Sequence, residues 1–553
     1  MPSSGTVQNH DAEKYQDRVT FEVPALSFFH IDLFDLVTLV IFICLSLWTT
    51  FLLAIRTGPD HIWTGTNGLY LGDQMQYLGW IRSSHADILI GNPYIASGGI
   101  HDYLNPGLAI SEILVDLGMS PWLSYLIWTP IAAIVFGLAV RLYVRRIVTS
   151  KAGRRMALVL ALFYLSPLSL IASSLHWNQV PFFQSYGLEM WPINYLWGYP
   201  LTAIAVALMI GALLNYERAR DERRLRLGAP LCALLCAWLQ PWQGATLIVL
   251  LLGCELYLRF RTGKPTQLLL LGITLGAAAV PLFYYFLLGH FDPTWKLANQ
   301  ADSQQLPSLP INDLILSLLP LLIFAALAYW RYQNGFQFLT ARVWPICAVG
   351  VLYMIAITGV GTFPKHTLQG IGVPLTILAV CGVAAIPGLF HSRSWTAVVS
   401  IVVAGLIIVP IGHELQQVEN LGSPSILGAE PFFLRSAEAD AFRYLAHSPE
   451  PGSVLSTVYL GQIVPAETGR PTWVGISSFT PAYAHRVDEA ARLFSGQMMK
   501  GAAVAFVRTT GVRFLLSDCS HPQDLSPLLG PDLQATIHFG CASVYIVKRT
   551  SSG

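Results

Sequence analysis

Four side chains on one face of a predicted helix offer the clearest chemistry in the sequence. They recur at positions i, i+3, i+4 and i+7 within residues 71–82, and are Asp73, Gln76, Tyr77 and Trp80. On a helix, this spacing puts all four on one side. A carboxylate there can take a proton from a hydroxyl group, while the amide and the two rings can hold a sugar. An amphipathic helix lying on a membrane surface, with its rings at the interface, would show the same pattern.

Two further acidic candidates lie in loops. Asp102 follows His101 in a glycine-rich turn, where the pair either joins a site or caps the turn. Glu189 is the only charged residue between Met156 and Tyr216, counting histidine as neutral, and it lies among aromatic residues. A lone carboxylate beside a membrane needs a partner or a task. We therefore expect Glu189 to be either a structural hydrogen-bond acceptor or a site residue.

A pair of basic residues lies in a short turn before a predicted membrane span. Lys365 and His366 fall within residues 361–367. A cation at the membrane edge can neutralise the phosphate of a lipid. A lysine that only extends its stem toward the headgroups is the alternative.

The composition is typical of a membrane protein, so membrane helices must position these residues. Of the 553 residues, 54% are hydrophobic and 12% are charged, whereas soluble proteins carry about 25% charged residues. This excludes a soluble enzyme, a disordered chain and a nucleic-acid binder, and the net charge of +1 implies no polyelectrolyte partner. Phosphate-binding loops, zinc-spaced Cys/His clusters and GxSxG motifs do not occur in the sequence. The predicted fold class is a polytopic α-helical membrane protein.

About eleven membrane-spanning helices are predicted. Residues 229–258 are too long for one helix and contain Pro241, which favours a hairpin of two short, tilted helices. The outside loop 56–120 is unusually long, and long loops are usually functional. The remaining apolar runs are long enough to cross a hydrocarbon core of about 30 Å; they are 31–55, 121–143, 156–175, 197–215, 266–288, 310–330, 343–360, 369–390 and 395–413.

The placement of Lys and Arg residues orients these spans. Predicted loops on the same side as the N-terminal tail, residues 1–30, contain seventeen Lys and Arg residues, and the opposite loops contain four. Positive residues concentrate on the cytoplasmic side of membrane proteins. The tail is therefore predicted to be cytoplasmic, and an odd number of crossings puts the C-terminal end outside the cytoplasm.

The C-terminal part has a mixed composition, and residues 428–553 are predicted to form a small extracytoplasmic α/β domain. Cys519 and Cys541 flank two of its predicted strands. An oxidising compartment permits a disulfide between them, and two separate thiols are the alternative. The pattern predicts strands at 453–459, 512–517 and 542–547 and helices at 437–446 and 487–495.

This layout resembles the GT-C superfamily of membrane glycosyltransferases. The long first outside loop with Asp73 near its start, the aromatic second loop and the outside tail carry the resemblance. Residues 365–371, 460–470 and 473–475 are similar to segments of bacterial members. The resemblance covers nearly the whole chain as a pattern, without a strong signature motif. It implies a GT-C-like transmembrane domain at 31–414, between the cytoplasmic tail and the outside domain, in a bacterial cytoplasmic membrane.

The resemblance also implies a reaction and its residues. A hexosyl or pentosyl group would pass from a polyprenyl-phosphate donor to an acceptor hydroxyl outside the cytoplasm, with inversion. Asp73 would be the catalytic base, and Lys365, with His366, would hold the donor phosphate. The acceptor would be a glycan, lipid or protein, and membrane lipids would be further partners. The other substrate-binding candidates are Gln76, Tyr77, Trp80, Asp102 and Glu189.

One departure from the superfamily concerns a metal. Many members carry paired acids in the first loop, whereas Asp73 is followed by Gln74. This leaves the second acid open, and with it a divalent metal ion as cofactor. Two other functions also stay open: a transporter or flippase for lipid-linked glycans, and a non-catalytic protein of cell-envelope assembly.

Overall fold

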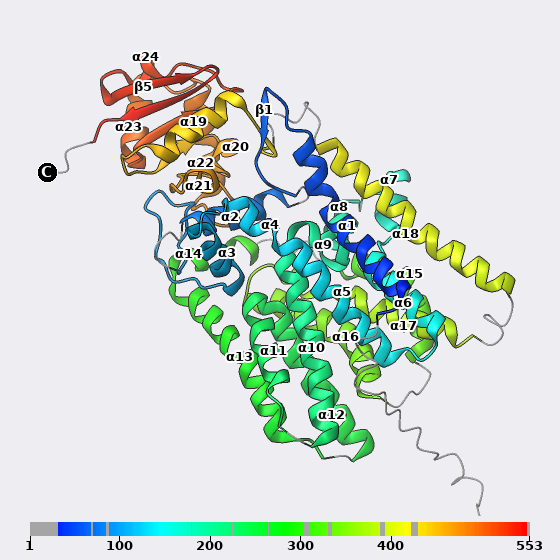
Figure 1. Ribbon diagram of the computed structural model, residues 1–553. Coiled ribbons are helices and arrows are strands. Elements are labelled where there is room, and N and C mark those ends of the chain that lie inside the picture. The colour runs from blue at the N-terminus through cyan, green and yellow to red at the C-terminus, as the bar shows by residue number, and fades with distance from the viewer. Residues whose placement is uncertain are drawn as a thin grey trace, which may run out of the picture.

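Apolar helices make up most of the chain, and an α/β region caps one end of their bundle (Figure 1). The computed structural model describes residues 31–67, 70–83, 88–178, 180–223, 225–263, 265–303, 310–329, 335–386, 393–421 and 430–549. The predicted cytoplasmic tail, residues 1–30, lies outside them.

Each predicted span contains helix in the described part of the chain, and nine helices there are each long and apolar enough to cross a membrane. A bent pair, α6 (Lys151–Phe163) and α7 (Leu168–Ser174), makes a tenth candidate. The nine are α1 (Leu33–Ile55), α4 with α5 (Pro121–Leu126, Trp128–Ile147), α10 (Pro200–Glu222), α12 (Pro241–Thr262), α13 (Leu268–Phe291), α15 (Ile311–Tyr329), α16 (Phe336–Thr358), η3 with α17 (Pro364–Leu368, Gly372–Ala384) and α18 (Arg393–Leu421).

Prolines decide where two of the predicted spans are interrupted. The single helix predicted at 156–175 is wrong, because α6 and α7 meet at an angle of 55° beside Pro167. A proline removes one helical hydrogen bond and clashes with the preceding turn. The break before Pro241 is confirmed, and it follows the short helix α11 (Gly228–Leu239). The second helix is longer than predicted, since α12 continues through two arginines to Thr262.

The long loop 56–120 contains the predicted helix with Asp73, α2 (Leu71–Ser83), and a second helix, α3 (Pro106–Asp116). The Asn105 side chain begins α3 by accepting hydrogen bonds from the backbone N–H groups of Gly107, at 3.0 Å, and Leu108, at 3.3 Å. The aromatic second loop contains α8 (Val180–Met190) and α9 (Pro192–Gly198), and α14 (Pro293–Ser303) follows α13.

The C-terminal region is built on a four-stranded sheet of order β3-β4-β6-β5. The strands are β3 (Val454–Ser456), β4 (Phe514–Ser517), β5 (Leu533–Phe539) and β6 (Ala542–Val547), and only the β3–β4 pair is parallel. Three strands and two helices, α19 (Ser436–His447) and α22 (Tyr483–Phe494), confirm the sequence pattern. The edge strand β5 and the helix α23 (Lys500–Thr510) are additional. β5 was not predicted because its residues are only partly buried and lack a continuous apolar run.

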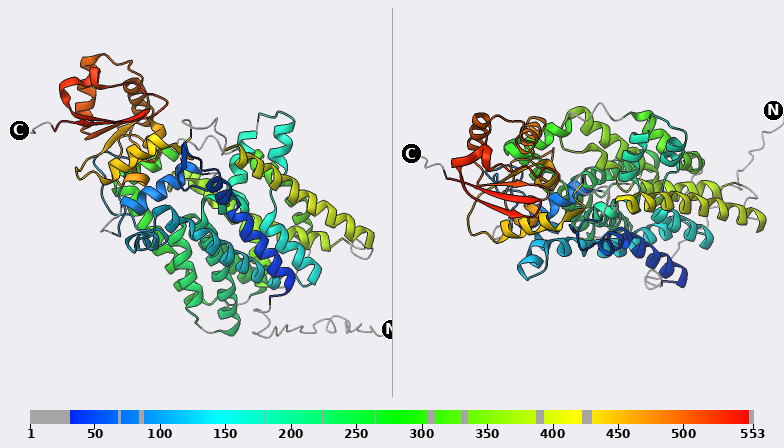
Figure 2. Two further views of the ribbon diagram at one scale, coloured as in Figure 1. Left: turned by 45° about the horizontal axis from the view of Figure 1, so that its top comes forward. Right: turned by 90° about the horizontal axis from the view of Figure 1, so that it is seen from above.

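Several contacts join this α/β region to loop 56–120. Strand β1 (His61–Trp63) pairs antiparallel with β2 (Phe433–Arg435). Helix α2 packs on α21 (Val464–Thr468), where Gly79 lets the two backbones approach closely. Helix α2 therefore lies between the bundle and the α/β region, as Figure 2 also shows.

Cys519 and Cys541 form a disulfide between the end of β4 and the start of β6. Replacing both with alanine is expected to lower the free energy of unfolding of the α/β region by about 3 kcal/mol, because a loop closed over a separation of 22 residues is released. Chemical denaturation measures the loss, and Cys44→Ala, which removes an exposed free cysteine, is the control. Non-reducing peptide mapping that finds both thiols free would contradict the bond.

Candidate active site

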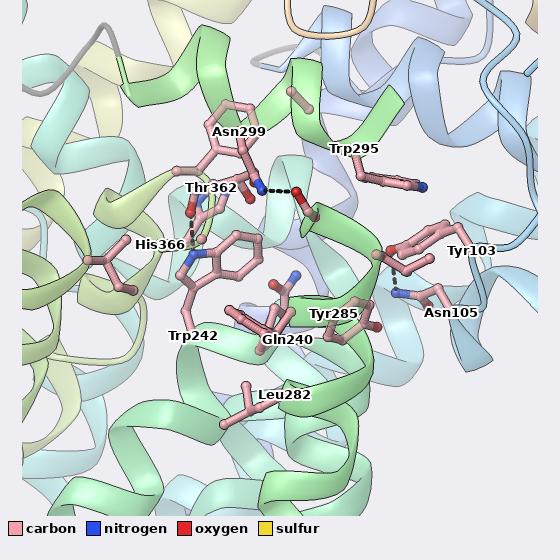
Figure 3. A pocket seen from close by; sticks show the side chains of 18 of the residues that line it. Tyr103, Asn105, Gln240, Trp242, Leu282, Tyr285, Trp295, Asn299, Thr362 and His366 are labelled. Carbon is pink, nitrogen blue, oxygen red and sulfur yellow. Dashed lines mark hydrogen bonds between the residues drawn. The ribbon is translucent and has the colours of Figure 1, made fainter. Parts of the chain in front are cut away.

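Asp73 lines a cavity of about 450 Å³. Figure 3 shows other residues of its lining, among them Trp242 and Trp295. Helix α2 forms one wall, and the beginning of α12, the end of α13, helix α14 and the turn before η3 form the others. Many aromatic rings from distant parts of the chain line it; they are Tyr77, Trp80, Tyr103, Tyr125, Tyr199, Trp242, Tyr285, Phe286, Trp295, Phe363 and Phe479.

The predicted face of α2 is the face that lines this cavity. Asp73 and the three other members of the i, i+3, i+4, i+7 pattern all contribute to the lining. Trp80 is only 3% exposed and packs against Trp295 and Phe479, with ring centroids 5.7 and 5.5 Å away. A ring buried in this way does not anchor a helix on a membrane surface. Phe479 also shows that the α/β region contributes to the cavity wall.

Burial controls the electrostatics of Asp73. The Tyr199 hydroxyl donates a hydrogen bond to Asp73 Oδ2. Removal from water raises the pKa of the Asp73 carboxyl above its ordinary value, although the bond from Tyr199 and the charge of His366 oppose the rise. A position near the start of a helix favours the charged carboxylate, but burial outweighs this effect and makes Asp73 a stronger base.

A second cavity of about 230 Å³ adjoins Asp73 and contains both predicted basic residues. Lys365 Nζ donates a hydrogen bond to Ser185 Oγ on α8 at 2.8 Å. His366 lines both cavities, and its ring packs edge-to-face against Tyr199 at 5.4 Å. The carboxylate of Asp73 thus lies where the two cavities meet.

Glu189 is the partner of His366. Its Oε2 lies 2.9 Å from His366 Nδ1 and accepts a hydrogen bond from Gln369 Nε2 at 2.6 Å. Glu189 also lines the smaller cavity. Both possibilities left open by the sequence therefore apply: Glu189 is a buried hydrogen-bond acceptor, and it is close to the site.

An uncommon backbone conformation positions the turn that carries Lys365. Phe363 has φ of 42°, in the left-handed region that non-glycine residues seldom adopt, and Gly361 has φ of 102°. The Trp242 indole holds this turn by donating to the carbonyl oxygen of Thr362 at 2.6 Å (Figure 3). Strained turns of this kind are often found at functional sites.

Asp102 is not brought to either cavity. Its carboxyl interacts with the Trp295 side chain, and its backbone carbonyl accepts a hydrogen bond from Tyr284 at 2.6 Å. Burial and the nearby carboxylate of Asp292 raise the pKa of Asp102. The neighbouring Tyr103 lines the large cavity instead. Asp102 therefore supports Trp295, which lines the large cavity, but does not itself line either cavity.

Several residues that complete the site were missed in the sequence. Tyr199 belongs to the aromatic second loop, where its hydroxyl cannot be told from those of its neighbours. Gln369 lies three residues after His366, and this spacing is the one available signal. Ser185 carried no signal, because nothing local connects α8 with Lys365.

The described residues do not offer a good metal site. No group of three or more His, Cys, Asp or Glu side chains among them could hold an ion together. Asp73 and Glu189 are occupied by hydrogen bonds from Tyr199, Gln369 and the His366 ring. The N–H groups of Lys365 and His366 at the smaller cavity suit a bound phosphate.

The sequence matches no protein-family model and no curated protein. Among solved structures, arabinofuranosyltransferase AftD from Mycobacteria is similar, with a TM-score of 0.50 and 13% identity over 94% of this chain and 42% of AftD. The Archaeoglobus fulgidus oligosaccharyltransferase gives 0.47 and 12% identity, covering 94% of this chain and 75% of its own. ArnT from Cupriavidus metallidurans, bound to undecaprenyl phosphate, gives 0.43 and 12%, covering 93% and 98%. The polytopic bundle with its C-terminal α/β region therefore has the fold of the GT-C glycosyltransferases.

Proposed function

We propose that the protein is a glycosyltransferase that moves a sugar from a polyprenyl-phosphate donor to an acceptor hydroxyl outside the cytoplasm. The observation that carries the proposal is the position of Asp73 between two cavities, one aromatic and one containing Lys365 and His366. The fold likeness to AftD supports it, since AftD is named an arabinofuranosyltransferase.

The reaction is a single displacement with inversion at the anomeric carbon. The acceptor enters the aromatic cavity and presents its hydroxyl to Asp73. The Tyr199 hydroxyl occupies Oδ2, so the other carboxylate oxygen takes the proton as the hydroxyl oxygen bonds to the sugar. The bond from the anomeric carbon to the phosphate oxygen breaks at the same time, and polyprenyl phosphate leaves with the bonding electron pair.

Lys365 and His366 stabilise the leaving phosphate from the smaller cavity. Charge develops on the phosphate oxygen as the bond breaks, and a fixed cation in a water-poor site stabilises it strongly. Ser185 holds the Lys365 ammonium, while Glu189 and Gln369 hold the imidazole of His366. Glu189 is therefore a positioning residue in this scheme, and the sugar lies between Asp73 and the two basic residues.

The aromatic cavity suits a sugar-bearing or similarly flat acceptor. Tyr77, Trp80 and Tyr103 present rings to it, and Gln76 adds an amide. Rings stack on the apolar faces of sugars, and the amide binds their hydroxyls. The transferred group is a hexose or a pentose, and the acceptor a glycan, lipid or protein.

Lipid analysis after deletion of the gene tests the function directly. Mass spectrometry should find an accumulated polyprenyl-phosphate sugar and a glycan lacking one residue. Restoring the wild-type gene should reverse both changes, and a gene encoding Asp73→Asn should not. A normal lipid profile, or equal rescue by the two genes, would reject the transferase and favour a transporter or assembly protein.

We also infer that the α/β region lies outside the cytoplasm and the N-terminal tail inside. The excess of Lys and Arg in the loops of the tail side supports this orientation. A cysteine replacing the exposed Asp524 should react with a membrane-impermeant reagent in intact cells. A cysteine replacing Arg218, at the opposite end of α10, should react only after lysis. The reverse pattern would overturn the orientation.

A further inference from the structure

A separate polar cavity of about 150 Å³ lies between α8, α9, the α6–α7 break, α15 and α18. It shares only Leu188 with the cavity of Lys365 and does not contain Asp73. Polar side chains line part of this cavity; those that matter here are Ser166, Gln184, Trp191, Asn194, Glu414 and Gln417.

Two buried polar atoms at this cavity lack a hydrogen-bond partner in the described part of the chain. Trp191 Nε1 is a donor and Asn194 Oδ1 is an acceptor. Trp191 and Asn194 are 1% and 2% exposed. Buried polar groups are almost always paired, by protein or by a bound molecule. One free donor and one free acceptor therefore point to a ligand with both functions.

Glu414 supplies a carboxylate to the same cavity, and no basic residue lines it. Among the described residues Glu414 forms no ion pair or hydrogen bond, while its neighbour His413 pairs with Gln417 at 3.0 Å. An ionisable residue within a membrane helix is normally functional and has a partner. A carboxylate in such a cavity suits a cation as its partner.

The position of Glu414 along α18 sets the depth of the cavity. Helix α18 has 29 residues, which gives about 43 Å at 1.5 Å per residue, longer than a hydrocarbon core of about 30 Å. Its polar residues after Glu414 mark the end that emerges toward the α/β region. Figures 1 and 2 show α18 along the edge of the bundle, where lipid would surround it. Glu414 therefore lies near the level of the lipid headgroups.

We propose that this cavity binds the ammonium group of a phosphatidylethanolamine-type lipid headgroup. A primary ammonium has three N–H donors, which the Glu414 carboxylate and Asn194 Oδ1 accept. The indole ring of Trp191 favours the same cation, and its Nε1–H donates to the headgroup phosphate. A quaternary choline headgroup cannot donate these hydrogen bonds. The proposal does not depend on sugar transfer, and a bound headgroup would tie α18 to α8.

Native mass spectrometry of the full-length protein tests the site. Delipidated protein is offered palmitoyl-oleoyl phosphatidylethanolamine or the matching phosphatidylcholine. Wild-type protein should retain one ethanolamine lipid with about tenfold preference, the value of a charge-assisted hydrogen bond. Glu414→Gln should abolish the preference. Glu419→Gln should keep it, because Glu419 lies on the same helix but pairs with Arg56 outside the cavity.

Three outcomes would overturn the proposal. Equal retention of both lipids by wild-type protein would show that the protein does not recognise the primary ammonium group. An unchanged preference in Glu414→Gln would show that the ethanolamine lipid binds at another site. Complete displacement of the lipid by equimolar O-phosphoethanolamine would identify a soluble amine as the ligand instead. If Glu414→Gln does not fold in phosphatidylcholine, Ser169→Leu, which fills the cavity and keeps the charge, should also abolish the preference.

Discussion

Replacing Asp73 with asparagine is expected to lower sugar transfer by about 10²–10⁴-fold, the usual contribution of a general base. The amide keeps the size of the side chain and the hydrogen bond from Tyr199, but it cannot take the proton of the acceptor hydroxyl. Expression and thermal stability should stay close to wild type. Initial rates with saturating donor and acceptor measure the effect on the chemical step.

The controls are the other two acidic candidates. Asp102→Asn should retain most of the activity, because Asp102 lines neither cavity. Glu189→Gln should show an intermediate loss, since it acts through His366. If Asp73→Asn transfers sugar at a near-normal rate while Glu189→Gln or Asp102→Asn abolishes transfer, the base has been assigned to the wrong residue.

The pH dependence of the wild-type enzyme should identify Asp73 as well. Burial raises the pKa of its carboxyl above the ordinary 3.8, and only the deprotonated form accepts a proton. Transfer should therefore be full above the raised pKa and fall as the pH decreases through it. The residual activity of Asp73→Asn should lack this decrease. A profile of kcat/KM against pH in both proteins makes the comparison.

Replacing Lys365 with alanine is expected to lower transfer by about 10²-fold, because one preorganised cation at a developing negative charge is worth roughly that factor. Lys365→Arg should be milder, since it keeps the charge at the cavity. Ser185→Ala is the matched control: it removes the partner of the Lys365 ammonium, 2.8 Å away, and leaves the charge in place. Turnover and donor affinity should be measured separately for the three variants.

The alternative role of Lys365 predicts a different series. A lysine that only reaches toward lipid headgroups would give alanine and arginine variants with equal, unimpaired transfer. A loss in Ser185→Ala as large as that in Lys365→Ala would show that position matters as much as charge.

Local properties of the sequence determined the membrane fold and one wall of the site. Hydrophobicity over about twenty residues is sufficient to define a span, and Pro241 marked a helix break through its own missing N–H group. The face of α2 with Asp73, Tyr77 and Trp80 follows from helical periodicity alone. The bend at Pro167 escaped prediction because the apolar run continues through it and the length suited a single helix.

The meeting of these residues was decided only by tertiary structure. Glu189 and His366 are 177 positions apart, and Tyr199 and Asp73 are 126 apart. Such pairs form because α8 packs on η3 and the residue before α10 reaches α2. No short-range pattern encodes that packing. Asp102 and Glu189 looked equivalent as carboxylates in loops. Packing puts Asp102 against Trp295, outside both cavities, and puts Glu189 beside His366. Side-chain type and spacing supplied the chemical groups, and long-range burial selected which of them share a cavity.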